Sequence, residues 1–194
     1  MKLKILFLGD SNSPVYSWLK KTEKYVACET GVLTPNYIAK NNFNYLISYG
    51  YKHIIKKEIL DLFNNKCINL HISYLPHNRG VDPNFWSFIN KTPKGVTIHF
   101  IDENIDTGNI IVQKEVFFDD LASQTLASTY EILQCEIQKL FYQNWNKIKE
   151  NKIQSIPQPK KGSFHLYKDK DSLLYLIKKE GWNTKITDIL KKIN

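Results

Sequence analysis

The first half of the chain alternates short apolar runs with segments in which apolar residues follow helical spacing. The runs have the length and the Ile, Leu and Phe content of buried strands, and turn residues separate them. We expect strands over residues 2–9, 24–28, 44–50 and 67–72. We expect helices from Pro14 to about Lys21, from Thr34-Pro35 onward, and over residues 56–63. This alternation predicts an α/β fold with an open, mostly parallel twisted sheet and helices on both faces.

The second half carries fewer strand signals and one long helical pattern. Residues 83–89 are expected to form a short helix, and residues 95–101 and 110–117 two strands. Apolar residues near helical spacing predict an amphipathic helix over residues 121–149. Pro157 and Pro159 end this pattern, and further helices are expected over 171–179 and 185–192. We therefore expect one domain over residues 1–150 and a short lysine-rich C-terminal appendage over 151–194 that is not an independent domain.

Composition places the chain among packed globular proteins. Of its 194 residues, 42% are hydrophobic and 13% aromatic, and no apolar run reaches the length of a membrane span. Residues 1–9 lack a small-residue cleavage site and fit a buried strand better than a signal peptide, so we expect a cytoplasmic protein. Cys28, Cys67 and Cys135 form no Cys-x-x-Cys pair, which argues for reduced thiols and against a zinc site. Cys67 is expected to be a buried strand residue.

The positive charge is concentrated toward the C-terminus. The formal net charge is +8, with 15 basic and 14 acidic residues in 1–146 against 12 lysines and 5 acidic residues in 147–194. Such a basic tail is compatible with nucleic acid, a membrane surface or an anionic small molecule, and equally with a solvated lysine-rich surface. Arg79 is the one arginine of the sequence, and its planar fork suits an anion better than lysine does.

The most specific chemistry lies where an expected strand ends. Asn69 and His71 are two residues apart, so their side chains point to the same face, and Asp106 of an Asp-Thr-Gly turn adds a carboxylate. An amide donor, a base and a residue that orients the base suit acyl transfer to an amine. Taken singly, each motif has an ordinary explanation, because Asp-Thr-Gly is also a common turn in which glycine supplies positive φ.

Several short motifs follow one another in a fixed order. They are Asn-x-His-x-Ser at 69–73, Leu-Pro at 75–76, a glycine at 80, Val-Thr-x-His at 96–99 and Asp-Thr-Gly at 106–108. In this order they resemble the folate-dependent formyltransferases, which include methionyl-tRNA, glycinamide ribonucleotide and sugar N-formyltransferases. The specific run covers residues 67–116, and the alternating pattern extends the likeness over residues 1–150. The resemblance implies the Rossmann-like formyltransferase fold and makes residues 1–150 the catalytic domain.

The resemblance also implies roles for individual residues. Asn69 would donate to the oxyanion, His71 would accept a proton at neutral pH, and Asp106 would orient His71 or a water. The formyl donor of the family is N10-formyltetrahydrofolate, whose pterin ring binds mostly to backbone groups. The corresponding loop comprises Tyr49, Gly50, Tyr51, Lys52, His53 and Ile54. No metal is expected, and for His99 we favour a structural role.

The segment after the catalytic strand is expected to face the acceptor. Its Pro-Asn-Phe-Trp form at 83–86 is most similar to the sugar N-formyltransferases, which act on nucleotide-linked amino sugars such as dTDP-4-amino-4,6-dideoxyglucose. Candidate substrate-binding residues are Ser73, Arg79, Asn84 and Trp86. The likeness further implies O-antigen or lipopolysaccharide biosynthesis and a homodimer, with neither nucleic acid nor membrane as a partner.

Two other functions stay open. One is a methionyl-tRNA formyltransferase-like or other amine formyltransferase. The tRNA enzyme, however, has a different acceptor loop and a C-terminal β-barrel of roughly 100 residues, against roughly 45 residues after the long helix here. The other is a non-catalytic module that binds RNA, a lipid surface or an anionic ligand through the basic tail. The complete set of Asn69, His71 and Asp106 argues against this second alternative.

Overall fold

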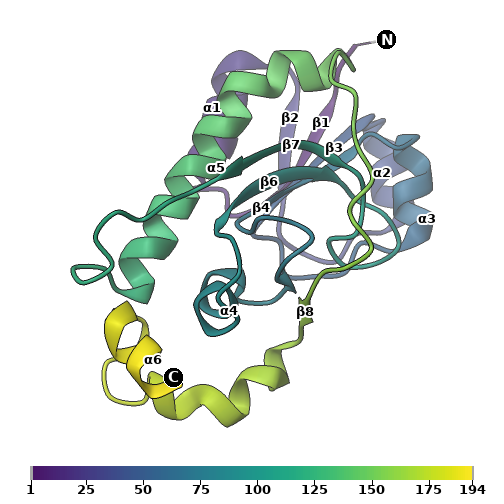
Figure 1. The fold of residues 1–194 in the computed structure, drawn as a ribbon. Helices are drawn as coiled ribbons and strands as arrows, with labels where there is room; N and C mark the ends of the chain where they lie inside the picture. The colour runs from purple at the N-terminus through teal and green to yellow at the C-terminus, as the bar shows by residue number, and fades with distance from the viewer. Residues whose placement is uncertain (1, 194) are drawn as a thin grey trace.

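The computed structural model describes residues 2–193, which fold around a six-stranded sheet with the order β2-β1-β3-β4-β6-β7 (Figure 1). Its strands are β1 (Ile5–Gly9), β2 (Val26–Glu29), β3 (Tyr45–Tyr49), β4 (Cys67–His71), β6 (Gly95–Phe100) and β7 (Ile110–Glu115). The first four run parallel, whereas β6 is antiparallel to β4 and β7 is antiparallel to β6. The predicted α/β class with a mostly parallel sheet is therefore confirmed.

Helices cover both faces of the sheet. They are α1 (Pro14–Thr22), α2 (Pro35–Asn41), α3 (Lys57–Leu60), α4 (Pro83–Ile89), α5 (Leu126–Lys149) and α6 (Ile186–Ile193), with 3₁₀ helices η1 (Asp61–Phe63), η2 (Tyr167–Leu176) and η3 (Gly181–Asn183). Alternate residues of β1 divide between two cores, as the two-residue period of a strand requires. Phe7 packs with α1 and α5, and Leu6 packs with α2 and α3 on the opposite face.

Strand β4 lies where the parallel and antiparallel parts of the sheet meet. Its neighbours β3 and β6 pair with it on both sides, so Asn69 stands beside Ser48 on one side and His99 on the other. The parallel strands end at one edge of the sheet, where the loops after β1, β3 and β4 come together. This edge is where the sequence predicts the chemistry.

Two expected helices differ from the structure. The long helix begins at Leu126 rather than at residue 121, because Thr125 and Ser128 form a reciprocal capping box that starts it there. The helix expected over 171–179 is instead the 3₁₀ helix η2, which ends at Leu176. Leu176 is buried and Lys170 pairs with Asp82, so tertiary contacts rather than helix propensity shape this segment.

The chain after α5 returns to the carboxyl edge of the sheet. We call residues 150–166 the post-helix segment; in Figure 1 it descends beside the sheet to β8 (Phe164–His165), which pairs with β5 (Arg79–Gly80). Further on, α6 packs against α4 in a third apolar cluster that also includes the start of α5. No helix within residues 2–193 combines the length and the apolar character needed to cross a membrane.

Candidate active site

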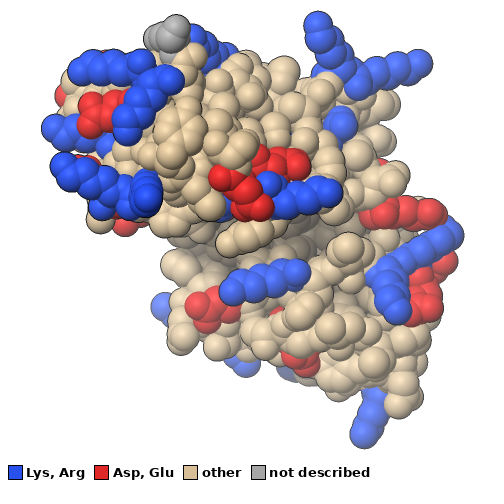
Figure 2. All heavy atoms as spheres, turned by 90° about the horizontal axis from the view of Figure 1, so that it is seen from below, with Lys and Arg blue, Asp and Glu red and all other residues tan. Residues whose placement is uncertain are grey.

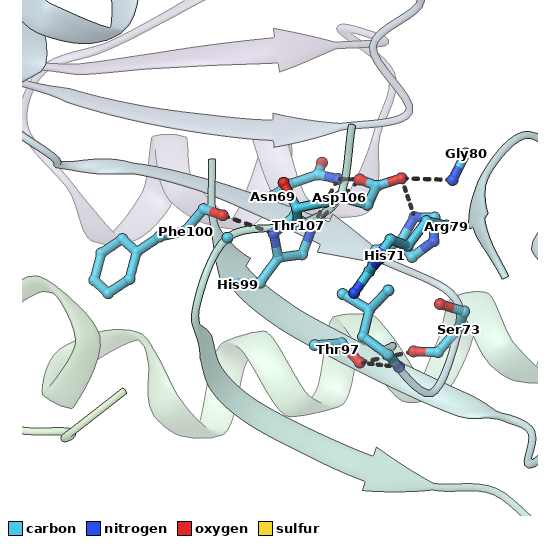
Figure 3. Close-up of polar contacts among 12 residues, drawn as sticks. Asn69, His71, Ser73, Arg79, Gly80, Thr97, His99, Phe100, Asp106 and Thr107 are labelled. Carbon is cyan, nitrogen blue, oxygen red and sulfur yellow. Dashed lines mark hydrogen bonds and ion pairs between the residues drawn. The ribbon is translucent and has the colours of Figure 1, made fainter. Parts of the chain in front are cut away.

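Three polar side chains meet at the carboxyl end of β4 (Figure 3). Asn69 and His71 project from one face of the strand, and Asp106 comes from the loop between β6 and β7. Asn69 Nδ2 donates a hydrogen bond to one carboxylate oxygen of Asp106 at 3.1 Å, and the other oxygen lies 3.7 Å from His71 Nδ1. The structure thus brings together all three residues for which the sequence suggests a catalytic role.

His99 is a fourth member of this cluster. The antiparallel register places it opposite Asn69, and its Nε2 lies 3.4 Å from both Asp106 Oδ1 and Asn69 Nδ2. Its Nδ1 lies 2.7 Å from the carbonyl oxygen of Phe100, which fixes the ring. The sequence favoured a structural role for His99, whereas the structure places it in the site. Its position follows from the antiparallel pairing of β4 with β6, which are separated in the chain by β5 and α4, so no local sequence pattern indicates it.

Asp106 is kept ionised although it is buried. Burial by itself raises the pKa of this carboxyl, but His71, His99 and the backbone N–H of Gly80 act in the opposite direction and prevail. The Gly80 N–H donates to Oδ2 at 2.9 Å. These partners hold the pKa of Asp106 well below its ordinary range, so a fixed negative charge faces the imidazole of His71 at neutral pH.

The two ring nitrogens of His71 face different groups. Nε2 lies 3.2 Å from the backbone carbonyl of Asn78, which can only accept, so we assign the neutral ring with the proton on Nε2. Burial lowers the pKa of His71 below its usual value, although the Asp106 carboxylate and the Asn78 carbonyl oppose this effect. His71 is therefore neutral at neutral pH, and its Nδ1 carries the lone pair that can accept a proton.

The turn that carries Asp106 is not the common turn described for Asp-Thr-Gly. Asp106 itself has the positive φ, at 54°, and its carboxylate leaves the turn to reach Asn69 and Gly80. The ordinary alternative for this motif, in which the glycine supplies positive φ, therefore does not describe this turn. Gly108 is needed for a steric reason, because a Cβ there would lie 1.9 Å from the carbonyl oxygen of Phe100.

A cavity of about 860 Å³ opens over these side chains. Its lining includes the four clustered polar residues Asn69, His71, His99 and Asp106. Another wall is the loop after β3, which contributes all six residues expected at the folate site: Tyr49, Gly50, Tyr51, Lys52, His53 and Ile54. Figure 2 shows a hollow across the middle of one face, with both basic and acidic side chains near its rim. The rim is therefore of mixed charge.

The loop after β3 combines one anchored side chain with open backbone. The hydroxyl of Tyr49 donates to Gln134 and accepts from Gln138 at 3.1 Å, which fixes the start of the loop to α5. Burial raises the pKa of Tyr49 to about 12, so this phenol stays neutral. Gly50 has a φ of 70°, and a Cβ there would meet nothing within 4 Å. The backbone at Gly50 is thus accessible to a flat ring.

Four residues were expected to bind the acceptor. Among the residues that the structure describes, Asn84 is the one of these four that lines the cavity. Its Nδ2 donates to the carbonyl of Leu126 and the hydroxyl of Thr129, so it also ties α4 to α5. Ser73 is 3% exposed, and its backbone carbonyl accepts a hydrogen bond from Thr97 at 2.7 Å. A direct contact of Ser73 with the acceptor stays a prediction.

Arg79 and Trp86 are each engaged within the protein. Arg79 donates from Nε and Nη2 to Oε1 of Gln158 at 3.0 and 2.9 Å, so two of its three guanidinium nitrogens are used. Trp86 is buried, and His165 stacks on one face of its indole with 3.9 Å between ring centroids. Anion binding by Arg79 and stacking of Trp86 on a sugar or base also stay predictions.

Sequence reasoning did not identify the contacts through which Asn78, Ser163 and Gln158 hold the site. Asn78 is fully buried and presents its carbonyl to His71. Ser163, in the post-helix segment, accepts a hydrogen bond from the Asn78 N–H at 2.8 Å and donates to its side chain at 3.2 Å. Gln158 contacts the Asp106 turn as well as Arg79. Neither the type nor the spacing of these residues distinguishes them in the sequence.

The cysteines and the acidic side chains are the other groups that could support chemistry. Cys67 is buried in β4 as expected, and burial raises its pKa to about 12, so it carries no thiolate at neutral pH. Within residues 2–193, no group of three or more His, Cys, Asp or Glu side chains is arranged to hold a metal ion. The hydrogen bonds and close contacts of the polar cluster around Asp106 make it the candidate active site.

Solved structures provide an independent comparison. Formyltransferase PseJ from Anoxybacillus kamchatkensis, solved with UDP-4,6-dideoxy-4-formamido-L-AltNAc and tetrahydrofolate, is 46% identical with a TM-score of 0.91; the match covers 98% of this chain and 100% of that one. An N-formyltransferase from Helicobacter canadensis, solved with folinic acid and dTDP-3-aminofucose, is 26% identical with a TM-score of 0.69, over 86% of this chain and 72% of that one.

Sequence comparison gives the same family. Residues 33–141 of the 194 match the formyl transferase family model. The methionyl-tRNA formyltransferase of Clostridioides difficile (strain 630) is 37% identical over 112 residues, which are 57% of this chain and 34% of that protein. The matched region spans less than half the length of such curated relatives. Because the family model covers more than half of the chain, this protein belongs to the formyl transferase family.

Proposed function

We propose that this protein is an N-formyltransferase that moves a formyl group from N10-formyltetrahydrofolate to the amino group of a nucleotide-linked amino sugar. The observation that carries the proposal is the meeting of Asn69, His71 and Asp106 at the floor of one cavity. An amide donor, a neutral imidazole and a carboxylate are the groups that acyl transfer to an amine requires. The match to a sugar N-formyltransferase over nearly the whole chain supports the same activity.

The formyl donor fits the wall formed by Tyr49–Ile54. When bound, N10-formyltetrahydrofolate supplies the formyl group in an activated form. The open backbone around Gly50 allows a flat ring to approach closely, and this loop is next to the polar cluster in the same cavity. Tetrahydrofolate is present in the structure of the PseJ neighbour, which supports the choice of donor.

Each residue of the polar cluster has a separate role in the proposed reaction. His71 takes a proton from the amine of the acceptor through Nδ1, because Nε2 is committed to Asn78. The amide of Asn69 has two hydrogens; one bonds Asp106 and the other donates to the formyl oxygen as negative charge develops there. Asp106 stabilises the imidazolium that forms, and His71 then returns the proton toward the leaving nitrogen.

For the acceptor we propose a UDP-linked 4-amino-4,6-dideoxy sugar. This choice follows the ligand named for the neighbour that is 46% identical over the full chain. The dTDP-linked amino sugars, including dTDP-4-amino-4,6-dideoxyglucose, are the next candidates, since the neighbour solved with dTDP-3-aminofucose is only 26% identical. Asn84 lies in the cavity wall, and Ser73, Arg79 and Trp86 are proposed to shape the acceptor side from behind it.

The test is a comparison of acceptors with one donor. The purified chain is incubated with N10-formyltetrahydrofolate and, in parallel, UDP-linked 4-amino sugars, dTDP-linked 3- and 4-amino sugars, and charged initiator tRNA. Mass spectrometry should show the gain of one carbonyl group on a sugar nucleotide, with the UDP-linked 4-amino sugar reacting fastest. Transfer to the tRNA alone would replace the proposal with the activity of the curated relatives. Salt-sensitive binding of RNA without any formyl transfer would favour a non-catalytic module.

Location and assembly are further parts of the proposal. We propose that the protein works in the cytoplasm as a homodimer, in the synthesis of formylated sugars for O-antigen or lipopolysaccharide. Sedimentation or light scattering of the purified chain tests the dimer directly. A mass equal to one chain at the concentrations used in the assay would exclude the dimer from the mechanism.

A further inference from the structure

The side chain of Gln158 connects two parts of the active site. Its Nε2 donates to the backbone carbonyls of Asp106 and Gly108, each at 2.8 Å. Its Oε1 accepts from Nε and Nη2 of Arg79 at 3.0 and 2.9 Å. The amide group therefore uses both of its hydrogens and both lone pairs of its oxygen in contacts with two segments.

Gln158 joins the Asp106 turn to the segment that contains Arg79 and Gly80. A direct hydrogen bond also links these two segments. The backbone N–H of Gly80, next to Arg79, donates to the carboxylate of Asp106 at 2.9 Å. Asp106, Gly80, Arg79 and Gln158 thus form a closed ring of covalent links and hydrogen bonds. Figure 3 shows the part of this ring around the carboxylate, with Asp106 between Asn69 and Gly80.

The backbone of the Asp106 turn needs such support. Asp106 has a φ of 54°, a conformation that aspartate adopts more readily than most residues, usually with a local hydrogen bond of its side chain. Here the carboxylate instead bonds the distant Asn69 and Gly80, so contacts with other segments hold the turn. Gln158 binds the carbonyls on both sides of Thr107 and so limits rotation of the turn. The isolated bridge between Ile156 and Ile110, with N···O distances of 2.8 and 2.9 Å, fixes the chain just before Gln158.

We propose that Gln158, acting with Arg79, is a positioning residue that sets the placement of the Asp106 carboxylate relative to His71. The inference rests on the proposed formyl transfer. It makes the post-helix segment part of the active site, although this segment lies outside the ordered motifs of the sequence. It also gives Arg79 a role in orientation, since Nε and Nη2 of its guanidinium group donate to the amide oxygen of Gln158.

The first measurement is kinetic. Gln158→Ala should lower kcat about 10- to 100-fold with little change in KM for either substrate, because a small misplacement of a catalytic group affects the reacting geometry most. Gln158→Glu should be at least as slow, because a carboxylate keeps the bonds to Arg79 but repels the carbonyls of Asp106 and Gly108. Gln154→Ala, an exposed glutamine of the same segment, is the matched control and should react like the parent chain.

The second measurement needs no activity and therefore separates this inference from the proposed function. The charge of Asp106 raises the pKa of His71, while His99 lowers it. If Asp106 moves in the Gln158 variants, NMR titration of the His71 ring should give a lower pKa than in the parent and in Gln154→Ala. A role limited to stability would reduce resistance to urea but leave this titration unchanged.

The outcomes are distinct. A parent chain that transfers no formyl group, but in which Gln158→Glu shifts the His71 titration, would end the proposed function and keep the positioning role. Folded Gln158→Ala and Gln158→Glu with parental kcat and parental His71 titration would overturn the inference. Should both fail to fold, Arg79→Lys carries the test, because lysine keeps the charge but lacks the fork that holds Gln158. It is then expected to show the same fall in kcat and the same direction of titration.

Discussion

The end of β4 and the post-helix segment hold the same site by different physical means. Asn69 and His71 sit on a strand paired on both sides, with Ile68 and Leu70 buried beneath them. The post-helix segment has little regular structure and is held mainly by side-chain hydrogen bonds of Gln158 and Ser163, a bridge at Ile156 and the short pairing of β8. The strand supplies the reacting groups, and the segment orients them, so the two regions should respond differently to substitution.

The largest effect is expected at the base. His71→Ala should lower kcat by roughly 10²–10⁴ without unfolding the chain, because it removes the group that accepts the proton. Initial rates followed by mass spectrometry of the sugar nucleotide measure the effect. His77→Ala, six residues further along and outside the polar cluster, should keep the parental rate. A rate for His71→Ala equal to that of the His77 variant would remove His71 from the mechanism and leave Asn69 as the one proposed catalytic group on β4.

The amide on the same strand comes next. Asn69→Ala should lower kcat by roughly 10²–10³ with KM nearly unchanged, since its hydrogen bond to the formyl oxygen strengthens as charge develops. The same acceptor assay separates kcat from KM, with Asn36→Ala on the exposed side of α2 as the control. A rise in KM at constant kcat would show that Asn69 binds substrate and does not stabilise the transition state.

The carboxylate lies between the two regions, and its effect should appear in the pH profile. Activity requires neutral His71, so kcat/KM should rise as pH increases through the pKa of His71. Burial lowers that pKa, which places the acid limb of the parent chain below the usual histidine value of about 6.5. The charge of Asp106 raises the pKa of His71, so Asp106→Asn should move the acid limb of the remaining activity to lower pH. If the acid limb of kcat/KM does not move in Asp106→Asn, that limb reflects the titration of a group other than His71.

The arrangement of side chains at the end of β4 could be predicted from the sequence, whereas the contacts of the post-helix segment could not, and the reason is physical. A strand has a fixed two-residue period, so Asn69 and His71 could be placed on one face, and the family motifs brought Asp106 to them. The register between β4 and β6, which brings His99 opposite Asn69, depends on strand pairing and is not visible in local patterns.

The post-helix segment shows where such reasoning ends. Gln158 is 52 residues from Asp106 and 79 from Arg79, and a glutamine in a proline-containing loop has no pattern that indicates its partners. The prediction of a helix over 171–179 was wrong for a related reason. Contacts such as that between Lys170 and Asp82 determine the shape of η2. Arg79 was expected to bind an anion on its chemistry alone, and its hydrogen bonds to Gln158 could not be predicted from that chemistry.

The smallest effect on rate is expected for Ser163→Ala, which removes two hydrogen bonds between the post-helix segment and Asn78. It should lower the free energy of unfolding by about 1–2 kcal/mol, because each bond contributes about 1 kcal/mol and the buried N–H of Asn78 loses its partner. Urea unfolding measures this change, and Ser155→Ala in the same segment is the control. Its kcat should fall less than in either β4 variant, because the carbonyl of Asn78 that holds His71 belongs to the intervening loop and not to Ser163. A loss of rate as large as that of His71→Ala would abolish the distinction between a strand that reacts and a segment that orients, and would place Ser163 among the groups that control the tautomer of His71.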